Sequence, residues 1–574
     1  MRLQSLPWLP DWLRHYQRSN LGDDALAGTI TAILLIPQAL AYAMLAGLPP
    51  EIGLYASVAP PIIYALTGSS RTLAVGPVAV AAVMVAAALG GFANGDPARA
   101  AAGALWLALL SGGFLLLFAI LRLGWLSHFV SHPVLNGFST GAAITIIGTQ
   151  IPTLTGLSLG NQESLLTLIG HLLPKLGQAH VQVMGCGLVT ILLLLLARHK
   201  LAGWLTAVGI VPKRAALAAR TMPLFIVVGA ISLSFWLDGA SHLPVVGTIP
   251  QGLPWPSADF LFVPGWQSLA GSALLIAVIG YVESLSVARL LALRRRQRID
   301  PDRELLALGS TNVASALFGG MPVAGGFARS MVNFDAGART QMAAIITAGW
   351  VALAAMTFSG ALAPLPKAVL AAIVVVAVTQ LIDLRGIVAT WRYDRSDGIS
   401  QLATLLGVLA LGIEPGLLLG IGLALMLYLR RTSNPHIAVV GRVPGTEHYR
   451  NILRHEVTTW PELLLVRIDE NLYFANAPQV EARVLSLMAE QHDAKHLVLI
   501  LSGVAAIDAS GLELLESLLT SLKEAGTQLH LAEIKGPVMD HLQGTHFLSA
   551  LGLEHTYLST EQAVATLTNP VNPT

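Results

Sequence analysis

The chain has 574 residues, of which 54% are hydrophobic and only 12% are charged, with a formal net charge of +1 and a mean hydropathy of +0.66. Soluble globular domains carry about 25% charged residues, so this composition excludes a soluble protein, and no basic, aromatic-rich patch points to nucleic acid. The single cysteine, Cys186, excludes an intrachain disulfide and argues against a thiol-ligated structural metal.

The N-terminal segment, residues 1–22, is polar and amphipathic, and it lacks the basic and apolar regions of a signal peptide. From there to about residue 430, apolar stretches long enough to cross a bilayer recur. We therefore expect an α-helical polytopic membrane domain, 23–432, with fourteen spans. They are placed at 24–46, 51–67, 71–90, 100–121, 129–151, 180–197, 221–238, 268–291, 303–318, 326–337, 340–358, 362–382, 397–412 and 414–430.

Lysine and arginine are concentrated in alternate loops, which predicts the orientation of the spans. One set of loops holds little beyond Arg99, Lys175 and Lys367. The other set is rich in basic residues, so we place it and both termini in the cytoplasm, and the protein in the inner membrane. The rich set comprises Arg122, Arg198, Lys200, Lys213, Arg214, Arg220, the cluster 294–303, Arg339, Arg385, Arg392, Arg395, Arg430 and Arg431.

The first span contains Gln38 and Tyr42, which are four residues apart and share one face of a helix. A glutamine is costly in lipid, so both side chains either line a cavity or make a helix–helix hydrogen bond and a packing contact. Spacing alone favours neither alternative. Other polar residues in the spans, such as Asn312 and Ser315, are expected to hold helices together.

The third and tenth spans are broken by glycine and proline, at Gly76-Pro77 and at Gly325-Gly326. They are seven spans apart, so they correspond if the domain consists of two seven-span halves of opposite orientation. Gly and Pro are common in membrane helices, but breaks in matching positions indicate a transporter binding site. Two half-helices meeting at their N-termini would bind an anion. Arg329, which should face a cavity or a partner rather than lipid, would add a full positive charge.

The eighth span carries Glu283, an acid at membrane depth. Such a carboxyl should be protonated, paired or facing water. One interpretation is a proton carrier controlled by the occupancy of the anion site. The alternative is a permanent ion pair with Arg329 or Arg289.

After Arg431 the sequence has ordinary charge, and strand-like and helix-like stretches alternate, which predicts a small α/β domain at 437–570. Strands are expected at 463–468, 496–501 and 527–532, and helices at 477–491 and 510–525. Ser510 follows a buried strand, where it suits an N-cap or first-turn position. A phosphate there would meet a helix N-terminus, so Ser510 is also a candidate regulatory site.

These features together resemble the SulP/SLC26 family of anion transporters. The resemblance is carried by residues 36–55, 69–80, 298–309 and 325–341 and by a C-terminal STAS domain. It implies two inverted seven-helix repeats, forming a core domain (spans 1–4 and 8–11) and a gate domain (spans 5–7 and 12–14). It also implies a homodimer with an elevator-like movement and a STAS domain that could bind a cytoplasmic regulator.

The resemblance also implies the positions of the site residues. The substrate-binding set would be Gln38, Tyr42, Pro77, Val78, Ala79, Phe327, Ala328 and Arg329. Many relatives have serine where this chain has Ala328, so a hydroxyl donor is lost from the pocket. Glu283 occupies the acidic position of proton-coupled members. Sodium-coupled members have a hydroxyl one turn later, where this chain has Val287, which cannot help coordinate Na⁺.

We therefore expect a proton-coupled symporter of sulfate or a similar oxyanion, with H⁺ as the coupling ion and no cofactor or metal. C4-dicarboxylate and bicarbonate remain alternative substrates, and an uncoupled anion channel on the same fold is an alternative mechanism. An enzyme is not expected, because the sequence has no nucleotide-binding loop and no nucleophile constellation.

Overall fold

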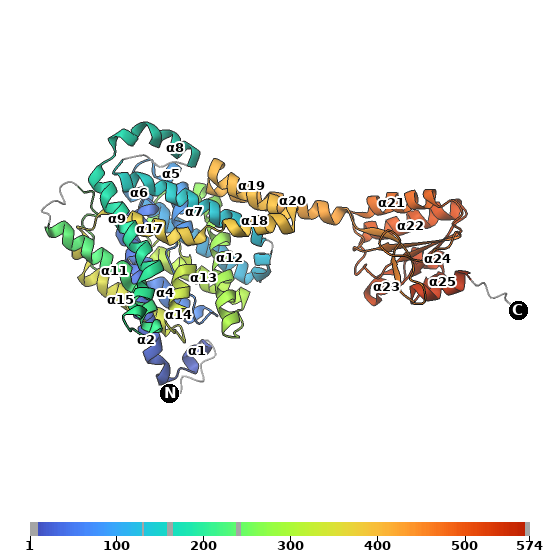
Figure 1. The fold of residues 1–574 in the computed structure, drawn as a ribbon, viewed down its shortest axis with the longest axis horizontal. Helices are drawn as coiled ribbons and strands as arrows, with labels where there is room; N and C mark the ends of the chain where they lie inside the picture. Colours follow the sequence, from blue (N-terminus) through green and yellow to red (C-terminus); the bar gives the residue numbers. More distant parts are fainter. Residues whose placement is uncertain (1–9, 129–130, 158–164, 237–242, 569–574) are drawn as a thin grey trace. The chain divides into compact units, whose positions relative to one another are not determined.

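The chain divides into two units, Met1–Ala424 and Leu425–Thr574. The structure, a computed structural model, describes residues 10–128, 131–157, 165–236 and 243–568. Residues 1–9 of the predicted N-terminal segment, and 569–570 of the predicted C-terminal domain, lie outside the described residues. The first unit is a bundle of helices, and the second contains a sheet with helices packed on it (Figure 1).

Every predicted span contains a helix. Seven helical stretches of the described residues are long and apolar enough to cross a membrane alone. The second span consists of two helices. The principal helices are α2 (Leu21–Leu45), α3 (Pro50–Tyr55), α4 (Ala59–Thr67), α5 (Ala79–Ala93), α6 (Pro97–Ile120), α7 (His132–Thr155), α9 (Val181–Leu196), α11 (Pro212–Trp236), α12 (Ala270–Arg294), α13 (Pro301–Leu317), α14 (Phe327–Asp335), α15 (Met342–Thr357), α17 (Lys367–Val378), α19 (Arg395–Leu411) and α20 (Ile413–Ser433).

Helix packing follows the inverted repeat. Seven spans on from α2 is α12, and seven spans on from α6 is α15. Helix α2 packs against α15, and correspondingly α12 packs against α6. In the same way α13 packs against α6, while its counterpart α4 packs against α15. Each of these contacts between a helix of the first half and a helix of the second half therefore has a counterpart, in which the equivalent helices of the two halves pack together.

The two broken segments meet as a short antiparallel pair of strands, β1 (Val75–Gly76) and β2 (Ala324–Gly325). Helix α5 begins three residues after the end of β1, and α14 begins two residues after the end of β2. The helix in the third span starts at Ala79, directly after the break predicted at Gly76-Pro77. Residues 71–78, the first part of the predicted span, are not helical.

Non-helical backbone at membrane depth must find hydrogen-bond partners within the protein. Here polar side chains supply them. Ser284 Oγ accepts from the Gly325 N–H at 2.7 Å, and Asn312 exchanges two bonds of 2.9 and 3.0 Å with the backbone of Val323. Ser315 donates to the Met321 carbonyl at 2.6 Å. The expectation that Asn312 and Ser315 join helices is therefore wrong, because both bond to the broken segment.

Glu304 anchors the loop that leads into the third span. Its side chain is fully buried, and it accepts hydrogen bonds from Tyr64 Oη (2.8 Å), Ser69 Oγ (2.7 Å) and the N–H groups of Ser69 (2.9 Å) and Ser70 (3.2 Å). Four donors on one carboxylate fix its position and the start of the segment that carries β1.

We expect Glu304→Gln to destabilise the membrane domain by about 2 kcal/mol, because an amide nitrogen would face donors in place of a carboxylate oxygen. Thermal unfolding of the purified protein measures this. Glu51→Gln is the control, because Glu51 has no hydrogen-bond partner in the described residues. Equal melting temperatures for the two variants would contradict the anchoring role.

The second unit is built on a six-stranded sheet with the order β4-β3-β5-β6-β7-β8. The three predicted strands and both predicted helices are present, while β3, β4 and β8 were not predicted. The elements are β3 (Ile437–Arg442), β4 (Tyr449–Asn451), β5 (Leu463–Ile468), β6 (His496–Ile500), β7 (Gln528–Ala532), β8 (Thr556–Tyr557), α21 (Ala477–Glu490), α22 (Ala509–Glu524), α23 (Gly536–Leu542), α24 (His546–Leu551) and α25 (Thr560–Thr568).

Strand β5 is apolar on both faces and contributes to the core of the second unit on each side of the sheet. Leu464 and Val466 belong to one apolar cluster, and Leu463 and Leu465 belong to another. Since side chains alternate between the faces of a strand, both faces of the sheet are covered. Ser510 lies in the first turn of α22 as predicted, but the N-cap is Asp508, whose side chain accepts from the Gly511 N–H at 2.9 Å.

Three histidines form a chain across the sheet of the second unit. His530 is 1% exposed, with Nε2 at 3.1 Å from Nδ1 of His496 and Nδ1 at 3.2 Å from Nδ1 of His555. A neutral imidazole can donate through one nitrogen and accept through the other, which suits this arrangement. Burial, followed by the neighbouring His555 and His496, lowers the pKa of His530 to about 3.

We expect this unit to lose stability as the pH falls below about 6.5, because unfolded His530 binds a proton that the folded form excludes. Between pH 6.5 and 3, His530 alone should change the free energy of unfolding by up to about 1.4 kcal/mol per pH unit. The dependence of this free energy on pH should therefore be weaker in His530→Gln than in wild type. Substitution of the exposed residue, His492→Gln, should leave the dependence as in wild type. Denaturant unfolding of a 434–574 fragment between pH 5 and 8 checks this. If the free energy of unfolding changed with pH equally in wild type and His530→Gln, this role of His530 would be contradicted.

Candidate binding site

The starts of α5 and α14 provide free hydrogen-bond donors at the centre of the membrane domain. Each helix is preceded by an extended residue, Val78 and Gly326 respectively, and neither N-terminus is capped by a side chain. The first N–H groups of a helix have no partner within it and carry its positive dipole end. Both starts therefore offer donors and partial positive charge.

A small cavity of about 50 Å³ lies between these two helix starts. All eight residues of the predicted binding set line it, and so does Glu283. The structure thus brings together residues from four separate spans, as predicted. Residues of α17 and the turn after it complete the wall, and these were not predicted. The added lining residues are Val80, Gly326, Ala377, Val378, Gln380 and Leu381.

Arg329 ties the two broken segments together. It is 4% exposed, and its guanidinium donates to the Ala74 carbonyl from Nε (3.3 Å) and Nη2 (3.2 Å), and to the Pro77 carbonyl from Nη1 (3.1 Å). Within the described residues no carboxylate pairs with it. Its contacts satisfy backbone carbonyls but leave its positive charge uncompensated beside the cavity.

Two glycines make room for this guanidinium. A Cβ atom on Gly76 or on Gly326 would lie 3.2 Å from Nη2 of Arg329. This separation is shorter than ordinary contact, so a side chain at either position would require the guanidinium to shift by a few tenths of an ångström. Gly76 and Gly326 therefore allow the close approach of Arg329.

Glu283 lies on α12 and is only partly buried, because it faces the cavity. Across the described part of the chain it has no hydrogen-bond or ion-pair partner. The alternative of a permanent pair with Arg329 or Arg289 is therefore absent from this state. Val287, one turn further, is buried and offers no oxygen. No cluster of three or more His, Cys, Asp or Glu in the described residues could hold a metal.

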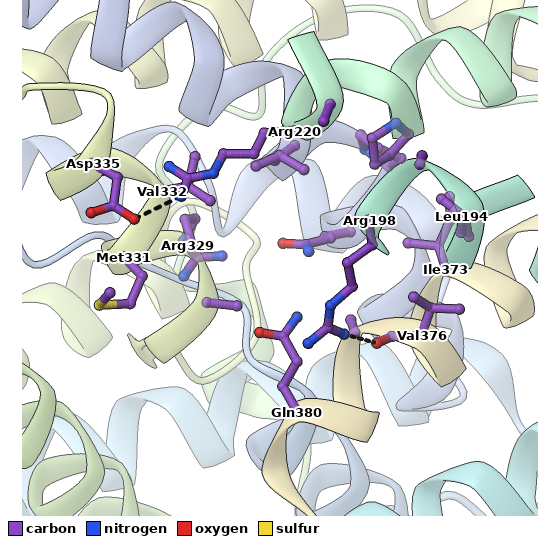
Figure 2. A pocket seen from close by; sticks show the side chains of 18 of the residues that line it. Leu194, Arg198, Arg220, Arg329, Met331, Val332, Asp335, Ile373, Val376 and Gln380 are labelled. Atoms are coloured by element: carbon purple, nitrogen blue, oxygen red, sulfur yellow. Dashed lines mark hydrogen bonds and ion pairs between the residues drawn. The ribbon is translucent and has the colours of Figure 1, made fainter. Parts of the chain in front are cut away.

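A larger vestibule of about 510 Å³ adjoins the cavity (Figure 2). The two share a wall consisting of Gln38, Phe327, Ala328, Arg329, Ala377 and Gln380. Arg198 and Arg220, both from the predicted cytoplasmic loops, line the vestibule, and Arg220 Nη2 forms an ion pair with Asp335 Oδ2 at 2.8 Å.

A separate cavity of about 450 Å³ is lined by residues that include Gly47 and Lys367. It shares no described lining residue with the site. The site therefore adjoins the vestibule that contains Arg198 and Arg220.

Gln380 and Arg198 were not predicted as site residues. A signal for Gln380 is present in the sequence, because Thr379-Gln380 is a polar pair inside a predicted span. Arg198 belongs to the basic residues of the predicted cytoplasmic loops, and only the packing of α9 against α17 shows which cavity it faces.

Comparisons with known proteins place these features in a family. The sulfate permease family matches residues 21–404, and the STAS domain matches residues 454–563. A probable sulfate transporter from Mycobacterium tuberculosis is 34% identical, over 98% of both chains. Sulfate transporter 4.1, chloroplastic, from Arabidopsis thaliana is 33% identical, over 96% of this chain and 81% of its own length.

Solved structures share the fold. Murine Solute Carrier 26 family member A9, an anion transporter in the inward-facing state, superposes with a TM-score of 0.89 at 23% identity, covering 98% of this chain and 94% of that one. The transmembrane domain of a cyanobacterium bicarbonate transporter, BicA, gives a TM-score of 0.59 at 24% identity, covering 71% of this chain and 98% of that one.

Proposed function

Because the chain belongs to the sulfate permease (SulP/SLC26) family, we propose that it is a secondary active transporter of sulfate or a similar oxyanion. The observation that carries this proposal is the cavity where two uncapped helix N-termini and the uncompensated Arg329 converge. Such a site attracts an anion and repels a cation.

The geometry supports a compact oxyanion as the substrate. Backbone N–H groups from both helix starts need several acceptors at once, and the oxygens of sulfate provide them. A cavity of about 50 Å³ suits such an ion better than a four-carbon dicarboxylate. Because Ala328 offers no hydroxyl, selectivity would rest on these N–H groups, Arg329, Gln38 and Tyr42.

Proton coupling is the second part of the proposal. Glu283 shares the cavity with Arg329 and has no fixed partner among the described residues, so its charge can respond to the anion. With the anion absent, the carboxylate would balance Arg329 across the cavity. With the anion bound, protonation would relieve repulsion between two negative charges. Anion and proton would then move together.

The transport step we propose is an elevator-like movement. The eight predicted binding residues and Glu283 all lie on spans 1–4 and 8–11, the proposed core. Ala377 lies at the end of α17 and Gln380 in the turn after it, and both belong to the proposed gate. The cavity thus lies at the boundary along which a core would slide.

We propose that the protein lies in the inner membrane with both termini in the cytoplasm, as the loop charges favour. The vestibule lined by Arg198 and Arg220 would then open to the cytoplasm, and this structure would represent an inward-facing state. Assembly as a homodimer and binding of a regulator by the C-terminal domain, with Ser510 as a candidate site, are also proposed.

Uptake of labelled sulfate into proteoliposomes tests the proposal. An imposed gradient with an alkaline interior should stimulate uptake, and excess unlabelled sulfate should compete better than fumarate, bicarbonate or chloride. Uptake without any response to the gradient would reject coupling, and preference for another anion in the panel would reassign the substrate. Electrical current without stoichiometric proton movement would favour an uncoupled channel.

A further inference from the structure

The vestibule carries an excess of positive charge. Its charged lining residues are three arginines and one aspartate, which leaves a net charge of +2. One of the arginines is Arg329, whose guanidinium is held by backbone carbonyls, and another, Arg220, is paired with Asp335. A cleft with one sign of charge concentrates counter-ions.

Of these three arginines, Arg198 has the weakest hydrogen bonding to the rest of the protein. The basic residues that follow it in the sequence, His199 and Lys200, do not line the vestibule, whereas Arg198 does. Nη1 of Arg198 makes one long bond, 3.5 Å, to the carbonyl of Val376. That carbonyl already accepts a 2.8 Å hydrogen bond from the Thr379 hydroxyl, so its hydrogen-bonding requirement is met without Arg198.

The local backbone explains how Arg198 reaches the vestibule. Helix α9 changes at residue 197 into a π-helical turn, Ala197–Leu201, before continuing as α10 (Ala202–Ala207). Wide turns of this kind alter the direction of side chains and are frequent at functional sites. Figure 2 shows Arg198 and Gln380 extending into the same space. Gln380 also lines the inner cavity.

We propose that Arg198 and Gln380 form a second, outer binding site for an oxyanion, between the vestibule mouth and Arg329; this inference rests on the proposed transport function. The guanidinium fork matches two oxygens of an oxyanion, and the Gln380 amide adds a further donor. An anion arriving from the vestibule would bind here before it enters the inner cavity.

A structural alternative is that Arg198 only anchors α9 at the membrane interface, as long basic side chains commonly do. The two roles differ in their kinetics. An outer site affects the concentration at which transport from one face is half-saturated, whereas an anchor affects the amount of folded protein and the rate from both faces.

The test measures initial rates of sulfate transport by the full-length protein in membrane vesicles of each orientation. Arg198→Gln should raise the half-saturating sulfate concentration at the vestibule face by about 5- to 10-fold and leave the other face unchanged. The maximal rate should stay within about 2-fold. Raising the ionic strength should weaken binding less in Arg198→Gln than in wild type, because less charge remains to be screened.

Arg198→Lys should recover part of the effect, and Gln380→Ala should cause a smaller change in the same direction. Lys200→Gln, in the same π-helical turn, is the matched control and should behave as wild type. Unchanged half-saturation in Arg198→Gln, or an equal loss of rate at both faces, would overturn the outer site. Absence of sulfate transport by the wild-type protein would instead contradict the proposed function.

Discussion

Replacing Arg329 with glutamine should reduce sulfate transport by about 100-fold or more, while the protein still folds. The substitution removes the full positive charge beside the cavity and at least two hydrogen bonds from a charged donor. The attraction that the guanidinium charge would exert on a bound anion is about 1.5–3 kcal/mol, as for hydrogen bonds to charged groups, and about 2.7 kcal/mol corresponds to 100-fold. Replacement of this one side chain is therefore expected to account for the whole 100-fold loss of sulfate transport.

Arg329→Lys separates charge from geometry. A lysine keeps the charge but has one nitrogen, so it cannot donate to the carbonyls of both Ala74 and Pro77 as the guanidinium fork does. We expect transport to stay at least about 10-fold below wild type. Arg71→Gln is the control, since Arg71 is an exposed residue that precedes β1 in the same broken segment and does not line the cavity. Transport near the wild-type rate in Arg329→Gln would contradict the proposed site.

Replacing Glu283 with glutamine should abolish accumulation driven by a pH gradient but preserve exchange of labelled for unlabelled sulfate. The amide has the shape of a protonated carboxyl and cannot release a proton, so the anion can bind and cross without coupling. Accumulation in proteoliposomes with an alkaline interior should fall to the level reached without a gradient.

Glu414→Gln is the matched control for this prediction, because Glu414 is another acid of the membrane domain, bonded to Ser272 and absent from the cavity wall. It should accumulate sulfate as wild type does. Gradient-driven accumulation by Glu283→Gln at the wild-type level would show that this carboxyl does not carry the proton.

The residues that line the candidate site could be predicted in part from local signals in the sequence, and in part from the family resemblance. A glycine-rich break, an arginine and an isolated acid stand out in an apolar stretch, and the spacing of the breaks relates the third span to the tenth. The structure adds that a Cβ at Gly76 or Gly326 would lie 3.2 Å from the Arg329 guanidinium, so these glycines allow its close approach.

What could not be predicted depends on contacts between distant residues. Residues 70–75 of the third span are held by side chains from the other half, such as Gln341, which donates to the Ser70 carbonyl at 2.7 Å. Glu304 lies in a stretch 298–309 that was recognised only as a motif, and its four donors come from residues 64–70. Secondary-structure propensity and hydropathy depend on neighbouring residues, so they do not indicate which residues far apart in the sequence form hydrogen bonds with each other.

The most direct measurement is a structure of the purified protein with selenate, a close analogue of sulfate whose selenium is located by anomalous scattering. We predict one dominant selenium peak in the cavity, within hydrogen-bonding distance of the first N–H groups of α5 and α14, and its loss in Arg329→Gln. A dominant peak elsewhere, such as among Arg71, Arg295 and Arg339, with the cavity empty would contradict the account.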